Sequence, residues 1–172
     1  MGVNNNDILI IGTSLDPDSR SQQLARVAFQ ICKTQNITAE ILDLRDYDLP
    51  IAGSADSFDS GLVQELEARV SQYHKIIFTV AIYNYDVSAA AKNFLELVGG
   101  SWLEGAVIGF ICTAGGKNSY MSVMGFANSL MLDFRAWIAP RFVYALKADD
   151  LRGQELKTRI EALVKTVSSG TG

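Results

Sequence analysis

Apolar runs alternate with amphipathic segments from one end of the chain to the other. Five runs rich in aliphatic residues predict strands over residues 7–12, 38–42, 75–80, 106–112 and 137–144. After each of them, apolar positions recur at helical spacing and predict helices over residues 19–34, 60–72, 88–99, 118–134 and 149–167. Each predicted strand is therefore followed by a predicted helix.

The central strand-like runs are apolar throughout instead of alternating with polar residues. Residues 76–80 and 107–112 are examples, and this pattern is typical of parallel strands covered on both faces. Five such units predict an α/β fold, a flavodoxin-like three-layer sandwich in which helices cover both faces of a five-stranded parallel sheet. No interior linker is visible, so residues 1–172 are expected to form one domain. Within it, residues 168–172 are expected to be a disordered tail, and Gly99-Gly100 is interpreted as a helix C-cap.

Composition excludes several classes of function. The chain is 48% hydrophobic and 20% charged, with a net charge of −4, and its Lys and Arg residues are scattered, which argues against nucleic-acid binding. No apolar run approaches the ~20 residues that cross a bilayer, and the first residues lack the pattern of a signal peptide, so we expect no membrane association and a cytoplasmic location. Cys32 and Cys112 lie far apart and predict neither a disulfide nor a metal site. The single histidine, His74, is interpreted as a surface or strand-edge residue, not a catalyst.

The turn after the first predicted strand has the features of an anion site. Ligands of doubly wound sheets bind beyond the carboxyl ends of the strands, and here Gly12 opens a turn rich in hydroxyls that leads into a helix. The N–H groups of a first helical turn have no intrahelical partners and attract anions, and the hydroxyls could add donors: Thr13, Ser14, Ser19 and Ser21. The alternative is an ordinary helix N-cap. Because the glycine-rich dinucleotide fingerprint and the Gly-Lys-Ser/Thr motif are both absent, a phosphate monoester fits better than a nucleoside triphosphate.

Two further loops at the same predicted edge are unusual. Residues 81–86 read Ala-Ile-Tyr-Asn-Tyr-Asp, which is aromatic and polar, and residues 113–117 read Thr-Ala-Gly-Gly-Lys, where glycines permit close approach of the backbone. A hydroxyl loop, an aromatic loop and a glycine loop that converge on one crevice suit a flat aromatic ring with a phosphate tail, which is the shape of flavin mononucleotide (FMN).

These three loops resemble those of the NAD(P)H-dependent FMN reductase family. The first family loop reads Gly-Ser-Leu-Arg-x-x-Ser-x-Asn-x-x-Leu-Ala, and residues 14–25 follow it from its serine without a gap. The second reads Pro-Glu-Tyr-Asn, six further residues and Leu-Lys-Asn-x-x-Asp, a spacing that residues 81–96 keep. The third reads Ser/Thr-x-Gly-Gly and corresponds to residues 113–116. The chain departs from the family at Asp16, where an arginine is frequent, and at Ala81, where proline is usual; Arg20 is expected to offset Asp16, or Asp16 to point outward.

The resemblance implies a set of cofactor-binding residues and no catalytic or metal-binding side chain. Its implied contacts to phosphate are Ser14, Ser19, Arg20 and Ser21, those to the ring edge are Ala81, Ile82, Tyr83 and Asn84, and those to the pyrimidine end are Thr113, Gly115 and Gly116. For Tyr85, ring contact and loop packing both remain open. Lys92 and Asn93 are interpreted either as fixing a loop or subunit contact or as a solvated helix face.

The resemblance also implies an activity. A family member binds FMN and NAD(P)H and passes hydride through the flavin to a flavin, quinone or similar acceptor in a ping-pong cycle, because the cofactor carries the chemistry. It further implies a homodimer or homotetramer, for which Trp102 and residues 121–131 are candidate interface elements, although the methionines there also suit a core. The alternatives on the same fold are a non-catalytic FMN-binding electron carrier and a flavin-free interaction domain.

Overall fold

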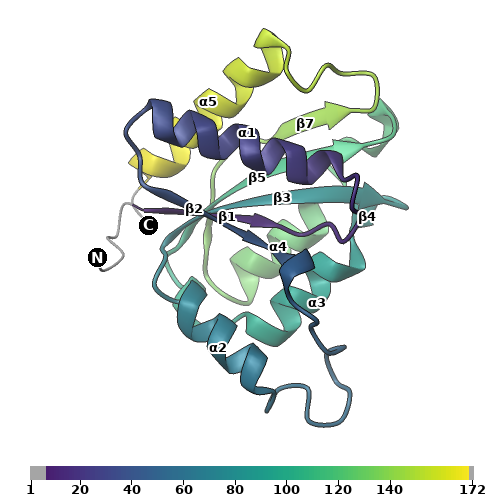
Figure 1. Ribbon diagram of the computed structural model, residues 1–172, viewed down its shortest axis with the longest axis vertical. Coiled ribbons are helices and arrows are strands. Elements are labelled where there is room, and N and C mark those ends of the chain that lie inside the picture. The colour runs from purple at the N-terminus through teal and green to yellow at the C-terminus, as the bar shows by residue number, and fades with distance from the viewer. Residues whose placement is uncertain (1–6, 171–172) are drawn as a thin grey trace.

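The computed structural model describes residues 7–170 (Figure 1). The expectations placed on residues 1–6 and on the last two residues of the tail lie outside this part of the chain. The central sheet has the strand order β2-β1-β3-β5-β6, with β4 paired to β3 and β7 paired to β5. This order places the first strand next to the third, which is the arrangement of flavodoxin-type doubly wound sheets.

The strands follow the apolar runs closely. All pairings except the antiparallel β3–β4 pair are parallel. Their bounds are β1 Ile8–Gly12, β2 Ala39–Asp43, β3 Lys75–Tyr83, β4 Asp86–Val87, β5 Val107–Ala114, β6 Trp137–Ile138 and β7 Val143–Leu146.

Alternate residues of each central strand enter two separate cores. In β1, Ile8 and Ile10 pack on one face of the sheet, while Leu9 and Ile11 pack on the other, and all four are fully buried. Helices α1 and α5 cover the first face and α2, α3 and α4 the second (Figure 1). Burial on both faces explains why the strands are continuously apolar. The helices span α1 Arg20–Thr34, α2 Gly61–Val70, α3 Ala89–Val98, α4 Met124–Leu132 and α5 Gln154–Ser169.

The sheet has seven strands, so the predicted count of five was wrong. The last predicted strand is divided into β6 and β7 around Pro140, which has no N–H for a sheet ladder. There the N–H of Arg141 donates to the carbonyl of Ala139 over 2.7 Å, a tight turn with proline at its centre. The other additional strand, β4, arises because the aromatic loop after β3 folds back as a hairpin.

Several predicted helix ends also differ, most of all in α4 and α5. The helix expected over residues 118–134 is shortened to α4, because Met121 adopts a positive φ of 65°, which a right-handed helix does not tolerate. A short 3₁₀ helix, Lys117–Ser119, occupies the beginning of that region. Helix α5 starts at Gln154 instead of residue 149 and continues through Ser169, so Ser168 and Ser169 are helical and not part of a disordered tail.

Several predictions outside the site can be placed. Gly99 is the C-cap of α3, as predicted, and its N–H donates to the carbonyl of Leu95. Trp102 is only 9% exposed and belongs to the core, so it is not an interface element. Asn93 fixes a loop, because its side-chain amide bonds the carbonyl of Pro50 and the N–H of Ala52, each over 2.8 Å. Among residues 7–170, no helix combines the length and the apolar character that a membrane crossing requires.

Candidate functional site

The three unusual loops meet at the carboxyl edge of the sheet. A cleft of about 260 Å³ lies between the turn after β1, the end of β3 and the end of β5. Eight of the predicted residues line it: Ser14, Ser19, Arg20, Ala81, Ile82, Tyr83, Thr113 and Gly115. The parallel register explains this convergence, since Gly12 pairs with Thr79, and Ala81 pairs with Thr113. A second cleft, of about 590 Å³, adjoins it and is lined by the predicted Asn84 and Gly116 as well as by Ile82 and Gly115.

The turn after β1 caps helix α1 and also contains hydrogen-bond donors that have no acceptor among the described residues. Ser19 is the N-cap of α1, and its hydroxyl accepts from the N–H of Gln22. Among the described residues, the N–H groups of Arg20 and Ser21 have no acceptor, as expected for the first turn of a helix. Ser14 Oγ accepts from the N–H of Asp16, which leaves its own hydrogen free to donate. The turn therefore offers backbone and hydroxyl donors to an anion.

Two of the hydroxyls are used elsewhere. The Thr13 hydroxyl donates to the carbonyl of Thr79 over 3.1 Å and joins β1 to β3. Ser21 is fully buried and does not line the cleft, and its hydroxyl lies 2.9 Å from that of Ser19. The arrangement gives Ser21 a role in holding Ser19.

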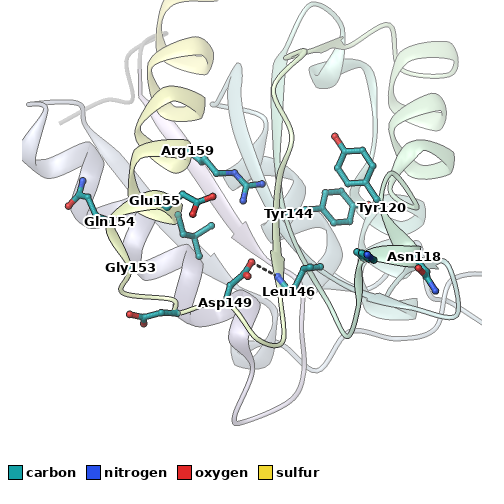
Figure 2. Close-up of a pocket in the computed structure, with 12 residues that line it drawn as sticks. Asn118, Tyr120, Tyr144, Leu146, Asp149, Gly153, Gln154, Glu155 and Arg159 are labelled. Carbon is teal, nitrogen blue, oxygen red and sulfur yellow. Dashed lines mark hydrogen bonds between the residues drawn. The ribbon is translucent and has the colours of Figure 1, made fainter.

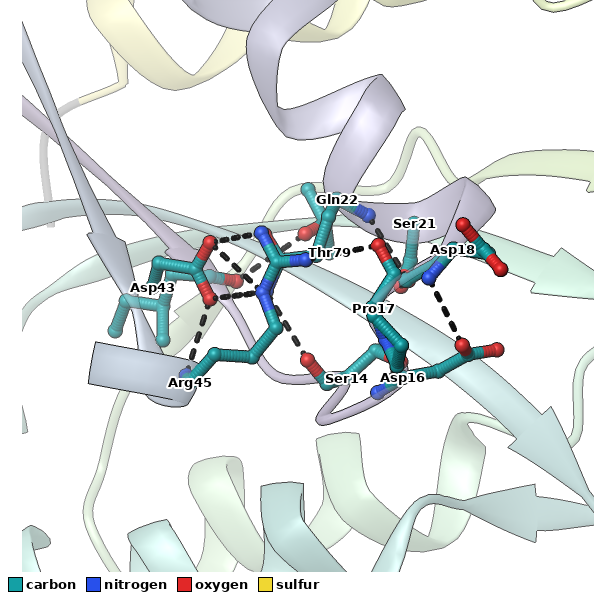
Figure 3. Close-up of polar contacts among 11 residues, drawn as sticks. Ser14, Asp16, Pro17, Asp18, Ser21, Gln22, Asp43, Arg45 and Thr79 are labelled. Atoms are coloured by element: carbon teal, nitrogen blue, oxygen red, sulfur yellow. Dashed lines mark hydrogen bonds and ion pairs between the residues drawn. The ribbon is translucent and has the colours of Figure 1, made fainter. Parts of the chain in front are cut away.

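A set of polar side chains braces the turn from the side of β2 (Figure 3). Gln22 Nε2 donates to the carbonyl of Ser14 over 3.2 Å and to Asp43 Oδ1 over 2.8 Å. Arg45 forms an ion pair with Asp43 and donates to the carbonyl of Pro17 over 3.2 Å. We call Gln22, Asp43 and Arg45 the loop brace. Burial raises the pKa of Asp43, but the hydrogen bonds and charge of Arg45 outweigh burial and hold that pKa below its usual value.

The brace depends on a glycine at the end of β1. A Cβ on Gly12 would lie 2.0 Å from Oε1 of Gln22, so a side chain at this position would displace the glutamine. The sequence pattern did not identify the brace, because Gln22, Asp43 and Arg45 belong to different elements. The position of Asp43 at the end of β2 was the available signal.

Arg20 reaches away from the turn. Its Nη2 donates to the carbonyls of Leu146 and Asp149, each over 2.9 Å, so it anchors the loop after β7. Its Nε is buried and has no partner among the described residues, which leaves one unused donor beside the cleft.

The part of the cleft next to the turn after β1 carries charges of both signs. Asp16 and Asp18 line it together with Lys147, a residue that the sequence analysis missed. Lys147 directly follows β7, so the rule that ligands bind beyond strand ends could have found it. Asp16 Oδ1 accepts from the N–H of Asp18 over 2.9 Å, which keeps this carboxylate within the turn.

The aromatic loop is a tight hairpin. Tyr83 pairs with Asp86, and the two residues between them, Asn84 and Tyr85, have φ values of 50° and 65°. Tyr83 and Tyr85 are 55% and 67% exposed, so both rings project from the protein at the clefts that they line.

A third cleft, larger than these two, contains none of the predicted residues. It measures about 780 Å³ and lies between the segment after β5, strand β7 and the start of α5 (Figure 2). The charged residues that line it are the cations Lys117 and Arg159 and the carboxylates of Asp149, Asp150 and Glu155. We place the candidate site in the two smaller clefts, because they lie at the ends of β1, β3 and β5, where the predicted residues converge. The volume of a cleft alone does not identify a binding site.

Both cysteine thiols are buried within the described part of the chain. Burial raises the pKa of the Cys32 thiol to about 11 and that of the Cys112 thiol to about 12, so both thiols are neutral and free at physiological pH. Within residues 7–170, no cluster of three or more His, Cys, Asp or Glu side chains is arranged to hold a metal ion.

The strand order and the cleft at the carboxyl edge define an α/β protein of the flavodoxin type, in which a turn with unpaired hydrogen-bond donors borders an open cleft. Residues 6–150 match the sequence profile of the NADPH-dependent FMN reductase family, and the chain belongs to that family. Members of this family are flavin oxidoreductases, for which FMN and NAD(P)H are the expected cofactor and substrate.

Individual relatives agree with this assignment. An NAD(P)H-dependent FAD/FMN reductase of Geobacillus thermodenitrificans strain NG80-2 is 27% identical over 125 residues, which are 72% of this chain and 66% of that relative. The match thus spans slightly less than two thirds of the relative. An oxidoreductase from Corynebacterium diphtheriae superposes with a TM-score of 0.78 at 17% identity, covering 95% of this chain and 94% of that one. FerB, a flavoenzyme NAD(P)H:(acceptor) oxidoreductase from Paracoccus denitrificans, superposes with a TM-score of 0.66 at 16% identity, covering 96% and 99%. At such identities these structures show a shared fold.

Proposed function

We propose that this chain is an FMN-dependent NAD(P)H oxidoreductase that delivers reducing equivalents to a flavin, quinone or similar acceptor in a ping-pong cycle. The observation that supports it is the convergence of three family-like loops on one cleft, with eight of the predicted residues in its wall. When bound, FMN supplies the redox chemistry, which is why a site with no histidine and no reactive thiol is sufficient.

The residues present fit the phosphate of FMN. Among the described residues, the N–H groups of Arg20 and Ser21 and the hydroxyl of Ser14 are donors without an acceptor of their own, and the Nε of Arg20, a residue that also lines the cleft, is buried without a partner. Lys147 contributes a positive charge against Asp16 and Asp18. We infer that the donors of the turn bind the phosphate, while Lys147 offsets the acidic pair.

The other two loops are assigned to the ring. Ala81, Ile82 and Tyr83 line the cleft from the end of β3, and Thr113 and Gly115 line it from the end of the neighbouring strand β5 and the loop after it. A Cβ on Gly115 or Gly116 would meet nothing within 4 Å, so this backbone borders open space that a flat ring can enter. These residues orient the ring and leave one side accessible for the nicotinamide and then for the acceptor.

Flavin absorbance of the purified protein tests the proposal. FMN is added to the protein without oxygen, and NADPH follows. A reductase binds the flavin and loses its visible absorbance on addition of NADPH, then regains it when a quinone is added. A protein that binds FMN but is not reduced by NADPH is an electron carrier, and a protein that binds no FMN is a flavin-free domain.

A matched pair of lysine variants tests the position of the phosphate. Lys147→Ala removes one of the two cationic side chains that line the cleft and should raise the FMN dissociation constant by roughly three- to tenfold. Lys165→Ala removes an exposed lysine of α5 outside the cleft and should leave that constant unchanged. Equal affinities of the two variants would remove Lys147 from the site.

We also propose that the protein forms a homodimer or homotetramer in the cytoplasm. Leu132 and Trp137, at the α4 and β6 edge, are 72% and 61% exposed and are candidates for an interface. Two free buried thiols suit a reducing compartment. Light scattering of the purified protein measures the oligomeric state directly.

A further inference from the structure

The turn of the β3–β4 hairpin contains a residue type that is unfavourable for its backbone conformation. Two-residue hairpin loops in which both residues have positive φ favour Asn-Gly, because glycine adopts the left-handed region without a steric penalty. Asn84 satisfies the first position, with φ 50°. The second position is Tyr85, with φ 65°, where a large side chain is unfavourable.

Among the described residues, Tyr85 has no side-chain hydrogen bond or aromatic contact that would offset its unfavourable backbone conformation. The side chain is 67% exposed, and among the described residues its hydroxyl has no hydrogen-bond partner and its ring no aromatic neighbour. Met121 and Arg135 also have positive φ, but neither lines the clefts of the site. Their carbonyls accept backbone bonds from Met124 and Gly105 respectively. Tyr85 is therefore unfavourable for folding at a position where glycine would be better, and such positions concentrate at functional sites.

The ring of Tyr85 stands at the open side of the site. It lines the cleft of about 590 Å³ together with Asn84 and the glycine loop, and that cleft shares Ile82 and Gly115 with the smaller cleft assigned to the flavin. A molecule that approaches the flavin from this cleft passes between an exposed, electron-rich phenol ring and exposed glycine backbone.

We propose that Tyr85 is a specificity-determining residue that stacks on the flat, electron-poor conjugated ring of the oxidised acceptor, a quinone or a free flavin. This inference rests on the proposed reductase function. Offset stacking on a complementary ring explains why an aromatic side chain occupies a position whose backbone torsion favours glycine. Because the Tyr85 ring is exposed, it is available to a substrate that binds and leaves.

Three variants of Tyr85 distinguish the effect of the aromatic ring from the effect of the strained left-handed backbone. Tyr85→Gly removes both, Tyr85→Ala removes the ring and keeps the strain, and Tyr85→Phe keeps both. The Gly and Ala variants should raise the KM for p-benzoquinone by roughly two- to tenfold, and the Phe variant should leave it unchanged. Tyr85→Gly should melt roughly 2–4 °C above Tyr85→Ala, because glycine relieves the left-handed backbone.

Further measurements identify the stacking partner. Ferricyanide has no ring, so its KM should be the same in all three variants and in the parent, as should the KM for NADPH and the dissociation constant of FMN. As a matched control, Phe58→Ala removes an aromatic side chain that is 55% exposed but lines neither cleft, and it should change none of these constants.

Other results would overturn the inference in distinguishable ways. An unchanged KM for p-benzoquinone in the Gly and Ala variants removes Tyr85 from acceptor binding. A raised KM for NADPH assigns the ring to the nicotinamide, and a raised FMN dissociation constant assigns it to the flavin. If the parent neither binds FMN nor oxidises NADPH, the proposed function itself fails and this inference fails with it.

Discussion

Replacement of Gln22 by methionine tests whether the loop brace shapes the phosphate turn. Methionine keeps the length of the side chain and removes the Nε2 donor, which bonds the Ser14 carbonyl over 3.2 Å and Asp43 Oδ1 over 2.8 Å. Gln22 is only 3% exposed, so water does not readily replace the lost donor. Asp43 retains its ion pair with Arg45, and the main loss therefore falls on Ser14.

Two magnitudes follow from this loss. A buried carbonyl without its donor costs about 1–3 kcal/mol, and the free energy of unfolding should fall by that amount. Release of one loop residue from its single conformation costs about 1–2 kcal/mol when a ligand orders it again, so the FMN dissociation constant should rise roughly 5- to 30-fold.

Urea unfolding and titration with FMN measure the two quantities on the same preparations. Gln23→Met is the matched control, because Gln23 is the exposed neighbour of Gln22 on α1, and this variant should change neither quantity. If Gln22→Met lowers the stability but leaves the FMN dissociation constant unchanged, the brace serves folding alone. The reasoning about the loop is then refuted.

Three further predictions concern charge, pH and thiols. Asp16→Asn keeps the Oδ1 acceptor for the Asp18 N–H and removes a negative charge near the proposed phosphate position. FMN should therefore bind roughly two- to fivefold tighter at low salt, and the gain in affinity should be smaller at high salt. Unchanged or weaker binding would contradict the placement of the phosphate. The pKa of Asp43 is depressed, so its contribution to stability is present above the ordinary carboxyl value of about 3.9 and is lost as pH falls through the depressed value. The difference in melting temperature between Asp43→Asn and the parent should therefore shrink in acid, and a constant difference would refute the assignment. Cys32 and Cys112, with pKa values raised to about 11 and about 12, should react with a disulfide reagent far more slowly in the native than in the unfolded protein at neutral pH, and rapid native labelling would contradict their burial.

Much of the candidate site was predictable because it depends on sequence order. In a parallel doubly wound sheet, the carboxyl end of each strand reaches the same edge. Loops that follow β1, β3 and β5 must therefore meet, and all the cofactor-binding residues predicted from them except Ser21 line two adjoining clefts. Lys147 follows the same rule at the end of β7.

Side-chain partners could not be predicted in the same way. Arg20 is next to the phosphate turn in sequence, yet its guanidinium bonds carbonyls more than a hundred residues away. Arg45 is distant in sequence, yet it bonds the carbonyl of Pro17 within the turn. These choices depend on which long side chain reaches which acceptor after the helices have packed.

The alternation of apolar and amphipathic segments determined, by itself, the layered α/β fold and the approximate limits of most elements, because burial on two faces requires continuous apolar strands. The order of the strands also determined the edge of the sheet at which the loops with the predicted residues meet. Only the tertiary structure decided the division of the last strand at Pro140, the hairpin that places Tyr85 at the cleft, and the brace behind the phosphate turn. These features depend on backbone torsions and on hydrogen bonds between residues far apart in the chain, and periodicity along a sequence contains neither.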